Sequence, residues 1–431
     1  MRSPPQATGL SLHPFRATRY ATDDLAAVTS PPYDVVEPAG FADLEMHPHN
    51  VVRLILPREG GDCDRYQQAA RVWDEWLASG VLATDADDAL WVYEQSGPGG
   101  DLVGIVGTIP IDQPRAVLPH EDVMPGPVVD RAELMAAVGA NLEPILLVHD
   151  PNPGETTSEV SATTAIVDST RERDFDVCMV GQGDVVHRLW RISDRATIQT
   201  INDDLAERSV LIADGHHRFA AYRLIHQRAA STPDSASTTR GLALIVDGRQ
   251  HPLTLGAIHR SLPNVSLDQA VKALDALDGH VDIHWLPNDK AIGPDGAPAV
   301  GTQPVPAQSI RLTDGQRSVD VVIPEPNTLV PAADRSILWR TLPTALLHEY
   351  LIPQVWDVDD AQVWYHHDTR GVQAATEKGR LGVLLPPLEL PTVIELARRG
   401  ELLPRKSTSF GPKPRTGLLM RQFATQRATP A

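Results

Sequence analysis

The chain has 431 residues, of which 42% are hydrophobic and 22% are charged, and its net charge at pH 7 is −18. This composition is typical of a globular protein and excludes a disordered chain. The acidic balance disfavours a general nucleic-acid-binding protein, because phosphate backbones repel negative charge. The two cysteines are too few for a disulfide framework, and no apolar run approaches the roughly 20 residues that span a bilayer. We therefore expect a cytoplasmic protein with no membrane or nucleic-acid partner.

The first stretch that can carry chemistry is a loop at residues 30–35. Its two prolines fix the backbone and present Tyr33 and Asp34 from a stiff segment, which fits a plain rigid turn as well as a site. Residues 49–56 follow as a predicted strand, whose apolar run is broken by Arg53. An arginine inside a buried strand needs an anionic partner, which either a structural carboxylate or a substrate can supply.

An amphipathic helix and a hairpin come next. Aromatic and apolar residues recur at helical spacing over residues 64–82, and apolar runs at 90–94 and 102–109 flank a turn rich in glycine. A further predicted strand ends in His120 beside Glu121. An imidazole next to a carboxylate suits acid–base chemistry or metal binding, although such pairs are also common on protein surfaces.

The rest of the chain is organised around residues 209–223, SVLIADGHHRFAAYR. Residues 210–213 form a short apolar run that predicts a buried strand, and residues 219–230 predict a helix. Gly215 lies between them, where it lets the backbone turn sharply. Because the start of a helix carries a partial positive charge and attracts anions, we expect a phosphate pocket in front of this helix.

The turn itself carries four further polar side chains, which are Asp214, His216, His217 and Arg218. The two imidazoles and the guanidinium add hydrogen-bond donors to an anion pocket. A carboxylate beside a phosphate is costly unless a cation such as Mg²⁺ lies between them, so Asp214 is predicted to hold this metal. A plain strand-to-helix connection is one alternative. A zinc site is another, but no spacing typical of zinc ligands supports it.

The later part of the chain adds cations and hydroxyls. A predicted strand ends in His259, and the segment 404–413 contains Lys406, Ser407 and Thr408 in an otherwise acidic protein. A solvated basic tail is the alternative interpretation of this segment. The chain has no Walker A loop, no GxGxxG fingerprint and no GxSxG turn. A nucleotide would therefore bind outside the P-loop and Rossmann schemes.

Eight pieces of the sequence occur in a familiar order, namely HPFRATRY, PPYDVV, HNVVRLILP, VYEQ, VLPHE, HRLWRI, LIADGHHRFAAY and RKSTSFGPK. On these pieces the chain resembles the bacterial and archaeal family known as domain of unknown function 1015, over about residues 12–423. That family is similar to the ParB/sulfiredoxin-like fold through the strand–DGHHR–helix unit, and free serine kinases of that fold carry a similar motif. The resemblance implies a small-molecule kinase whose favoured acceptor is free L-serine.

The resemblance also implies an α/β fold of the mixed α+β type. It predicts a ParB/sulfiredoxin-like phosphate-binding core at 170–262, with an N-terminal α+β lobe at 1–150 and a C-terminal α+β lobe at 263–431, and a site at the junction of the lobes. The sequence departs from the relatives in two ways. His216 stands where sulfiredoxins place a reactive cysteine, and no helix-turn-helix module typical of ParB proteins is evident. Both departures argue against the chemistry of those relatives.

We expect the DGHHR turn to bind the phosphoryl donor. Gly215, His216, His217 and Arg218 would hold its phosphates with backbone and side-chain donors. Asp214 would hold Mg²⁺ and, with His216, take part in catalysis.

Other residues complete the predicted site. Lys406, Ser407 and Thr408 are expected to contact phosphate. A carboxylate must take the proton of the acceptor hydroxyl, and either Asp34 or Glu121 can do so.

The predicted substrate-binding residues are Tyr33, Arg53, His120 and His259. The donor is ATP, ADP or pyrophosphate, because all three present the same terminal group. Two other interpretations stay open: a switch that hydrolyses its nucleotide without an acceptor, and a non-enzymatic scaffold with a vestigial pocket. The sequence leaves the oligomeric state undetermined, with a homodimer among the options.

Overall fold

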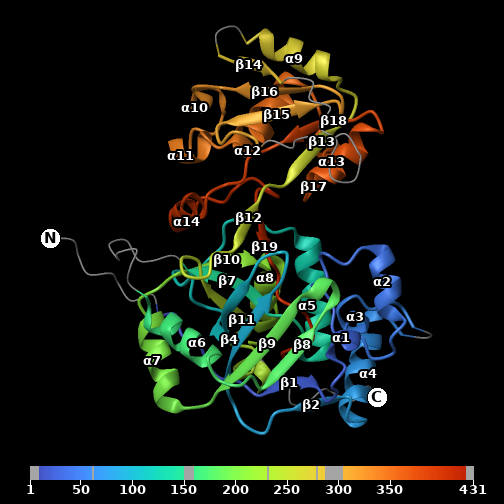
Figure 1. Cartoon of the computed structure of the whole chain (residues 1–431), viewed down its shortest axis with the longest axis vertical. Coiled ribbons are helices and arrows are strands. Elements are labelled where there is room, and N and C mark those ends of the chain that lie inside the picture. Colours follow the sequence, from blue (N-terminus) through green and yellow to red (C-terminus); the bar gives the residue numbers. More distant parts are fainter. Residues whose placement is uncertain are drawn as a thin grey trace, which may run out of the picture. The chain divides into compact units, whose positions relative to one another are not determined.

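The computed structural model describes residues 9–60, 63–149, 160–230, 233–277, 280–286 and 304–423 (Figure 1). The chain divides into two compact units. Unit 1 consists of Met1–Pro119, Val123–Leu253 and Gly411–Ala431, and unit 2 consists of His120–Asp122 and Thr254–Phe410. The chain thus leaves unit 1 and returns to it with its last residues.

Unit 1 is built on an eight-stranded mixed sheet. In spatial order its strands are β5 (Val117–Leu118), β10 (Val210–Asp214), β7 (Ile145–His149), β11 (Arg240–Asp247), β4 (Leu102–Pro110), β3 (Leu90–Ser96), β9 (Val186–Ile192) and β8 (Val177–Val180). Strand β10 runs parallel to β5 and antiparallel to β7. Its first four residues are buried, which is why a continuous apolar run in the sequence forms this strand.

Four longer helices pack on this sheet. They are α5 (Pro125–Val138), α6 (Ala162–Arg171), α7 (Arg195–Leu205) and α8 (His216–Ala229). Helix α8 packs against α5, and α6 packs against α7. The apolar residues of all four helices join the sheet residues in one core, to which α8 contributes Phe219, Tyr222 and Ile225. This burial fixes the position of α8 relative to β10, and with it the turn between them.

A second, four-stranded sheet brings the end of the chain into unit 1. Its strands, in order, are β2 (Leu82–Thr84), β1 (Ala17–Tyr20), β20 (Met420–Gln422) and β6 (Ala140–Asn141). The helices of this region are α1 (Leu25–Val28), α2 (Pro38–Glu45), α3 (Val52–Ile55) and α4 (Arg65–Ala78), with two short 3₁₀ turns elsewhere in the unit at Gln182–Asp184 and Pro233–Ala236. Because β20 pairs with both β1 and β6, the residues just before it are held within unit 1.

Unit 2 is built on a six-stranded antiparallel sheet. In spatial order its strands are β14 (Asp282–Trp285), β16 (Ser318–Val322), β15 (Ser309–Thr313), β18 (Leu381–Leu384), β13 (His259–Leu262) and β17 (Trp364–His366). The helical segments are α9 (Leu267–Asp275), α10 (Pro326–Leu329), α11 (Ile337–Arg340), α12 (Pro343–Leu346), the π-helix η3 (Leu347–Val355), the 3₁₀ turn η4 (Asp360–Gln362), α13 (Thr369–Thr376) and α14 (Leu390–Arg398). A two-stranded ribbon joins β12 (Thr254–Gly256) and β19 (Ser409–Gly411).

The predicted mixed α/β class is confirmed, and so are the hairpin β3–β4 and the strand–turn–helix unit. Helix α8 begins at His216, so the predicted start at residue 219 is too late. The predicted strand at 49–56 is wrong, because these residues form the single helical turn α3. Asn50 lies just before this turn and holds it in place. Its Oδ1 accepts the N–H of Val52 at 2.9 Å, and its Nδ2 donates to the backbone carbonyls of Ala27 and Thr29.

The predicted division into three lobes stays a prediction. The eight-stranded sheet of unit 1 takes strands from both 1–150 and 170–262. Within the described ranges, no helix combines the length and the apolar character that a bilayer crossing needs.

Candidate functional site

The turn between β10 and α8 requires glycine. Gly215 has φ of 97°, a left-handed conformation that other residues adopt at a cost. A Cβ at this position would lie 2.9 Å from Cγ2 of Ile145, closer than carbon atoms pack. The chain therefore passes from strand to helix within one residue. Asp214 is the last residue of the strand, and His216 is the first residue of the helix.

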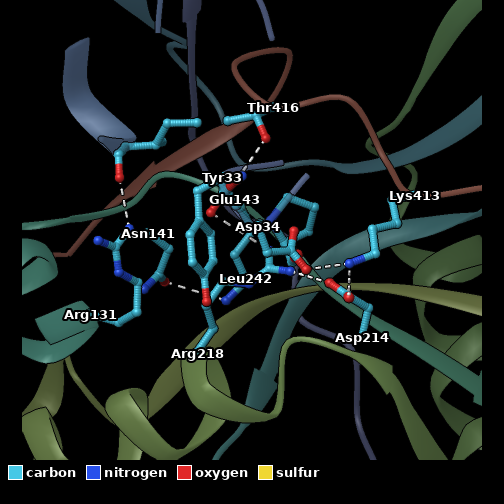
Figure 2. Close-up of polar contacts among 12 residues, drawn as sticks. Tyr33, Asp34, Arg131, Asn141, Glu143, Asp214, Arg218, Leu242, Lys413 and Thr416 are labelled. Atoms are coloured by element: carbon cyan, nitrogen blue, oxygen red, sulfur yellow. Dashed lines mark hydrogen bonds and ion pairs between the residues drawn. The ribbon is translucent and has the colours of Figure 1, made fainter. Parts of the chain in front are cut away.

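Lys413 connects two carboxylates at this bend. Its Nζ lies 2.6 Å from Oδ1 of Asp214 and also pairs with Oδ2 of Asp34, as Figure 2 shows. Burial opposes the charge on Lys413, but the two carboxylates outweigh it and raise the pKa of the ammonium above its usual value. The loop at residue 34, the strand end at residue 214 and the C-terminal segment thus meet at one cation.

Arg218 holds the other side of Asp214. Its Nη2 pairs with Oδ2 of Asp214, its Nη1 donates to the Pro144 carbonyl at 2.6 Å, and Oε2 of Glu143 lies 3.9 Å away. The guanidinium is 4% exposed, so its charge is balanced inside the protein. Burial by itself would raise the pKa of Asp214, but the charges of Arg218 and Lys413 prevail and lower it. The same pairing raises the pKa of Arg218, against the effect of its burial.

Glu143 anchors the loop that carries Asp34. Its Oε1 accepts the backbone N–H of Tyr33 at 3.2 Å and the hydroxyl of Thr416 at 2.8 Å. The ring of Tyr33 lies under the guanidinium of Arg131, whose carbon is 4.5 Å from the ring centre. Burial raises the pKa of Tyr33 to about 12, so the phenol is neutral at pH 7. Figure 2 shows how these contacts tie the loop to the cluster.

The two histidines of the turn have different surroundings. Burial lowers the pKa of His216 to about 4, although the charge of Asp214 opposes this shift, so the imidazole is neutral at pH 7. His217 accepts the backbone N–H of Met124 at its Nε2, at 3.2 Å. Since Met124 is the N-cap of α5, this bond ties the first turn of α8 to the start of α5.

Within the ranges that the structure describes, Arg53 has no carboxylate partner. On α3 its Nη2 donates to the backbone carbonyl of Glu45 at 2.6 Å, and its Nε donates to that of His47 at 3.4 Å. Arg53 lies on a half-buried helical turn, so backbone carbonyls can satisfy its guanidinium. In the predicted buried strand the guanidinium would have required a negatively charged partner. A contact with substrate stays a prediction.

Six of the predicted site residues lie in unit 2, and these are His120, Glu121, His259, Lys406, Ser407 and Thr408. Two of them are in contact, since Nε2 of His120 lies 2.8 Å from Oγ1 of Thr408. His259 accepts the backbone N–H of Leu385 at 3.2 Å, and burial lowers its pKa to about 4. The hydroxyl of Ser407 donates to the carbonyl of Pro404 at 2.5 Å, and Lys406 has a left-handed φ of 58°. Their roles, and a site at the junction of the lobes, stay predictions.

Sequence reasoning missed Lys413 and Glu143. Lys413 belongs to the piece RKSTSFGPK, but it is 199 positions from Asp214, and long-range contacts such as the backbone bridge between Ser30 and Thr416 and the pairing of β20 hold this segment in unit 1. Glu143 carries a clearer signal. It is an acidic residue two positions before a buried strand, and a carboxylate in such a place needs a cation or donors.

The cluster does not fit the predicted role of Asp214 as a magnesium ligand. Both carboxylate oxygens are engaged by cations, one by Lys413 and the other by Arg218. In the part of the chain that the structure describes, no group of three or more His, Cys, Asp and Glu side chains is arranged to hold a metal ion. An ammonium group occupies the place between the two carboxylates that a divalent cation would need.

A family model described as "Protein of unknown function (DUF1015)" matches residues 12–345. The chain belongs to this family. The predicted resemblance is thereby confirmed, and the family description itself assigns no activity. None of the curated proteins compared with the chain matches it.

Several solved structures resemble this chain at low similarity. A free serine kinase in complex with AMP is 14% identical, with 71% of this chain and 87% of that chain covered and a TM-score of 0.36. A conserved hypothetical protein from Pyrococcus furiosus is 16% identical, with coverage of 71% and 90% and a TM-score of 0.34. SbnI from Staphylococcus aureus, truncated at its C-terminus, is 12% identical, with coverage of 74% and 87% and a TM-score of 0.35. At these TM-scores the likenesses do not establish a shared function.

Proposed function

We propose that the protein is a small-molecule kinase, which transfers a phosphoryl group from a nucleotide to a hydroxyl group, with free L-serine as the first acceptor to test. The observation that carries the proposal is the ammonium of Lys413 held between Asp34 and Asp214 at the Gly215 turn. The resemblance of the DGHHR turn to that of free serine kinases supports the choice of reaction. The proposal includes a ParB/sulfiredoxin-like arrangement around β10 and α8.

The turn supplies what a terminal phosphate needs. Helix α8 has 14 residues, and its N-terminus carries a partial positive charge toward the bend. The ammonium of Lys413 adds a full positive charge beside it. Phosphoryl transfer is catalysed mainly by positioning and by neutralising the charge on the moving group. Gly215, His216 and His217 would line the donor site, and Lys413 would contact the transferred group.

Asp34 is the base in this proposal. Its carboxylate would accept the proton of the acceptor hydroxyl while the oxygen bonds to the terminal phosphorus and the bond to the bridging oxygen breaks. The leaving nucleotide keeps that electron pair. Asp34 is preferred to Glu121 because it shares Lys413 with Asp214. Its side chain is 35% exposed, which leaves it accessible to an acceptor.

The experiment is a matrix of donors and acceptors followed by phosphorus NMR. ATP, ADP and pyrophosphate are each combined with serine, threonine and other hydroxy compounds, and the nucleotide is supplied as its magnesium complex. We expect a phosphate monoester only when an acceptor is present, and we expect Asp34→Asn to abolish it. Release of inorganic phosphate without any acceptor would instead support the switch, and no turnover with any pair would overturn the kinase proposal.

A further inference from the structure

A small pocket adjoins the cluster in unit 1. It has a volume of about 280 Å³ and is bordered by Pro31 and Val35 from the loop that carries Asp34, by His187 of β9, and by Lys413 and Arg415. Pockets for drug-sized ligands start at roughly 300 Å³, so this one suits a small metabolite better than a whole nucleotide. Lys413 lines the pocket and also pairs with Asp34. A ligand here would therefore lie next to the proposed base.

Arg415 brings a positive charge that no carboxylate balances. Its Nε donates to Oγ1 of Thr29 at 2.9 Å, and its Nη2 donates to the carbonyls of Thr29 at 2.9 Å and Ala26 at 3.4 Å. Among the described residues, none of its partners is an acid. Burial lowers the pKa of this arginine, which is the opposite of the shift at carboxylate-paired Arg218. A partly buried guanidinium of this kind is a binding group for an anion.

His187 offers a hydrogen-bond acceptor in the same pocket. It is 4% exposed, and its Nδ1 lies 2.9 Å from the hydroxyl of Tyr93. That hydroxyl donates to Oε1 of Gln95 at 3.0 Å and accepts the N–H of Arg415 at 3.1 Å. The network thus assigns the imidazole proton to Nδ1 and leaves Nε2 as an acceptor. Nε2 has no protein partner in the described ranges, so a ligand donor can reach it.

We infer that this pocket binds the acceptor molecule by its carboxylate. In this arrangement the guanidinium of Arg415 donates hydrogen bonds to the ligand carboxylate. Nε2 of His187 accepts an N–H or O–H on the ligand carbon next to that carboxylate, and the reacting hydroxyl of the ligand points toward Asp34. The ligand class is a small carboxylic acid with a hydroxyl and a second hydrogen-bond donor. The identity of the ligand as an acceptor rests on the proposed function, whereas the binding chemistry rests on the pocket alone.

The test measures binding in the absence of any nucleotide. L-serine, L-alanine and L-serinamide are titrated into the full chain by calorimetry, since alanine keeps the carboxylate and serinamide lacks it. We expect serine and alanine to bind and serinamide to bind at least about tenfold more weakly, as expected for loss of a charged hydrogen-bonded pair. Equal binding of serine and serinamide, or no binding of serine, would overturn the inference.

Variants then assign the preference to Arg415. We expect Arg415→Gln to remove the distinction between serine and serinamide, and Arg415→Lys to keep part of it. Because Arg415 also contacts Thr29, the thermal unfolding of both variants is compared with that of Arg399→Gln, which replaces an exposed arginine of α14. A folded Arg415→Gln protein that still prefers serine would contradict the inference.

The two proposals fail separately. If the protein binds carboxylates but no donor supports phosphorylation, the proposed kinase function is refuted and the proposed binding pocket is retained. If Arg415→Gln phosphorylates serine with an unchanged KM for serine, the proposed binding pocket is refuted and the proposed kinase function is retained.

Discussion

Two of the buried arginines, Arg218 in unit 1 and Arg260 in unit 2, are neutralised in different ways. Arg218 in unit 1 is 4% exposed and faces the carboxylates of Asp214 and Glu143. Arg260 in unit 2 is fully buried, and its direct partners are Nε2 of His348 at 3.0 Å and the backbone carbonyls of residues 258 and 405. The pKa is raised for Arg218, whereas burial lowers that of Arg260 to about 10.

The two arginines differ in how their charge is balanced. Carboxylates pair directly with Arg218, so it belongs to a cluster of oppositely charged groups at a turn. For Arg260 an acid acts through an intermediate, because Nε2 of His348 accepts from the guanidinium and Nδ1 of the same ring is 2.9 Å from Oδ1 of Asp360. The ring of Tyr365 also lies 5.0 Å from the guanidinium carbon of Arg260. Direct pairing also occurs in unit 2, where Nε of Arg311 lies 2.7 Å from Oδ1 of Asp320. The site that we propose for phosphoryl transfer differs from that pair because two cations, Arg218 and Lys413, share the carboxylate of Asp214.

The largest expected effect comes from breaking the pairing of Arg218. Arg218→Met leaves two carboxylates without their buried cation, which costs about 3–5 kcal/mol of unfolding free energy. Arg260→Met removes bonds to neutral acceptors and should cost less, about 1–2 kcal/mol. Urea unfolding combined with peptide-resolved hydrogen exchange measures each unit separately. An equal or larger loss from Arg260→Met would contradict the comparison.

The next effect is a loss of stability in mild acid. The pKa values of His187 and His216 in unit 1 and of His259 in unit 2 are lowered to about 4, chiefly by burial. The unfolded chain therefore binds more protons than the folded one below about pH 6.5, so stability is full above that pH and falls as the pH drops toward 4. Asp214, whose pKa is lowered, adds a further loss at still lower pH.

Unfolding midpoints measured from pH 8 to pH 4 test this dependence. His187→Gln should flatten the profile of unit 1 and His259→Gln that of unit 2, each without affecting the other. A profile that stays flat down to pH 4.5 in the parent protein would show that these imidazoles are not held neutral.

The smallest effect is expected at exposed ion pairs. Arg399 and Glu395 on α14 are 48% and 46% exposed, and Arg228 and Glu133 in unit 1 are 47% and 44% exposed. Arg399→Ala and Arg228→Ala should each change stability by less than about 0.5 kcal/mol, because water screens such pairs. If either substitution lowers the free energy of unfolding as much as Arg218→Met does, burial does not explain the difference between the exposed ion pairs and that of Arg218.

The local parts of the site could be predicted from the sequence, and the long-range parts could not. The apolar run before Asp214 and the glycine after it specify a strand, a bend and a helix within one short segment. Lys413 reaches that bend through long-range pairing, of Thr416 with Ser30 and of β20 with β1 and β6, and such pairing leaves no local mark in the sequence. The segment around Arg53 is a helical turn and not the predicted strand for a related reason. A short apolar run fits a strand or a helical turn, and contacts of Asn50 with distant carbonyls decide between them.

The most direct test of the account is the rate of phosphate-ester formation by Lys413→Gln. If the ammonium shared by Asp34 and Asp214 neutralises the transferred phosphoryl group, kcat should fall by at least about 100-fold. Lys378→Gln, which changes an exposed lysine of unit 2, should keep the parent rate. A folded Lys413→Gln protein that works at half the parent rate or faster would contradict the central claim.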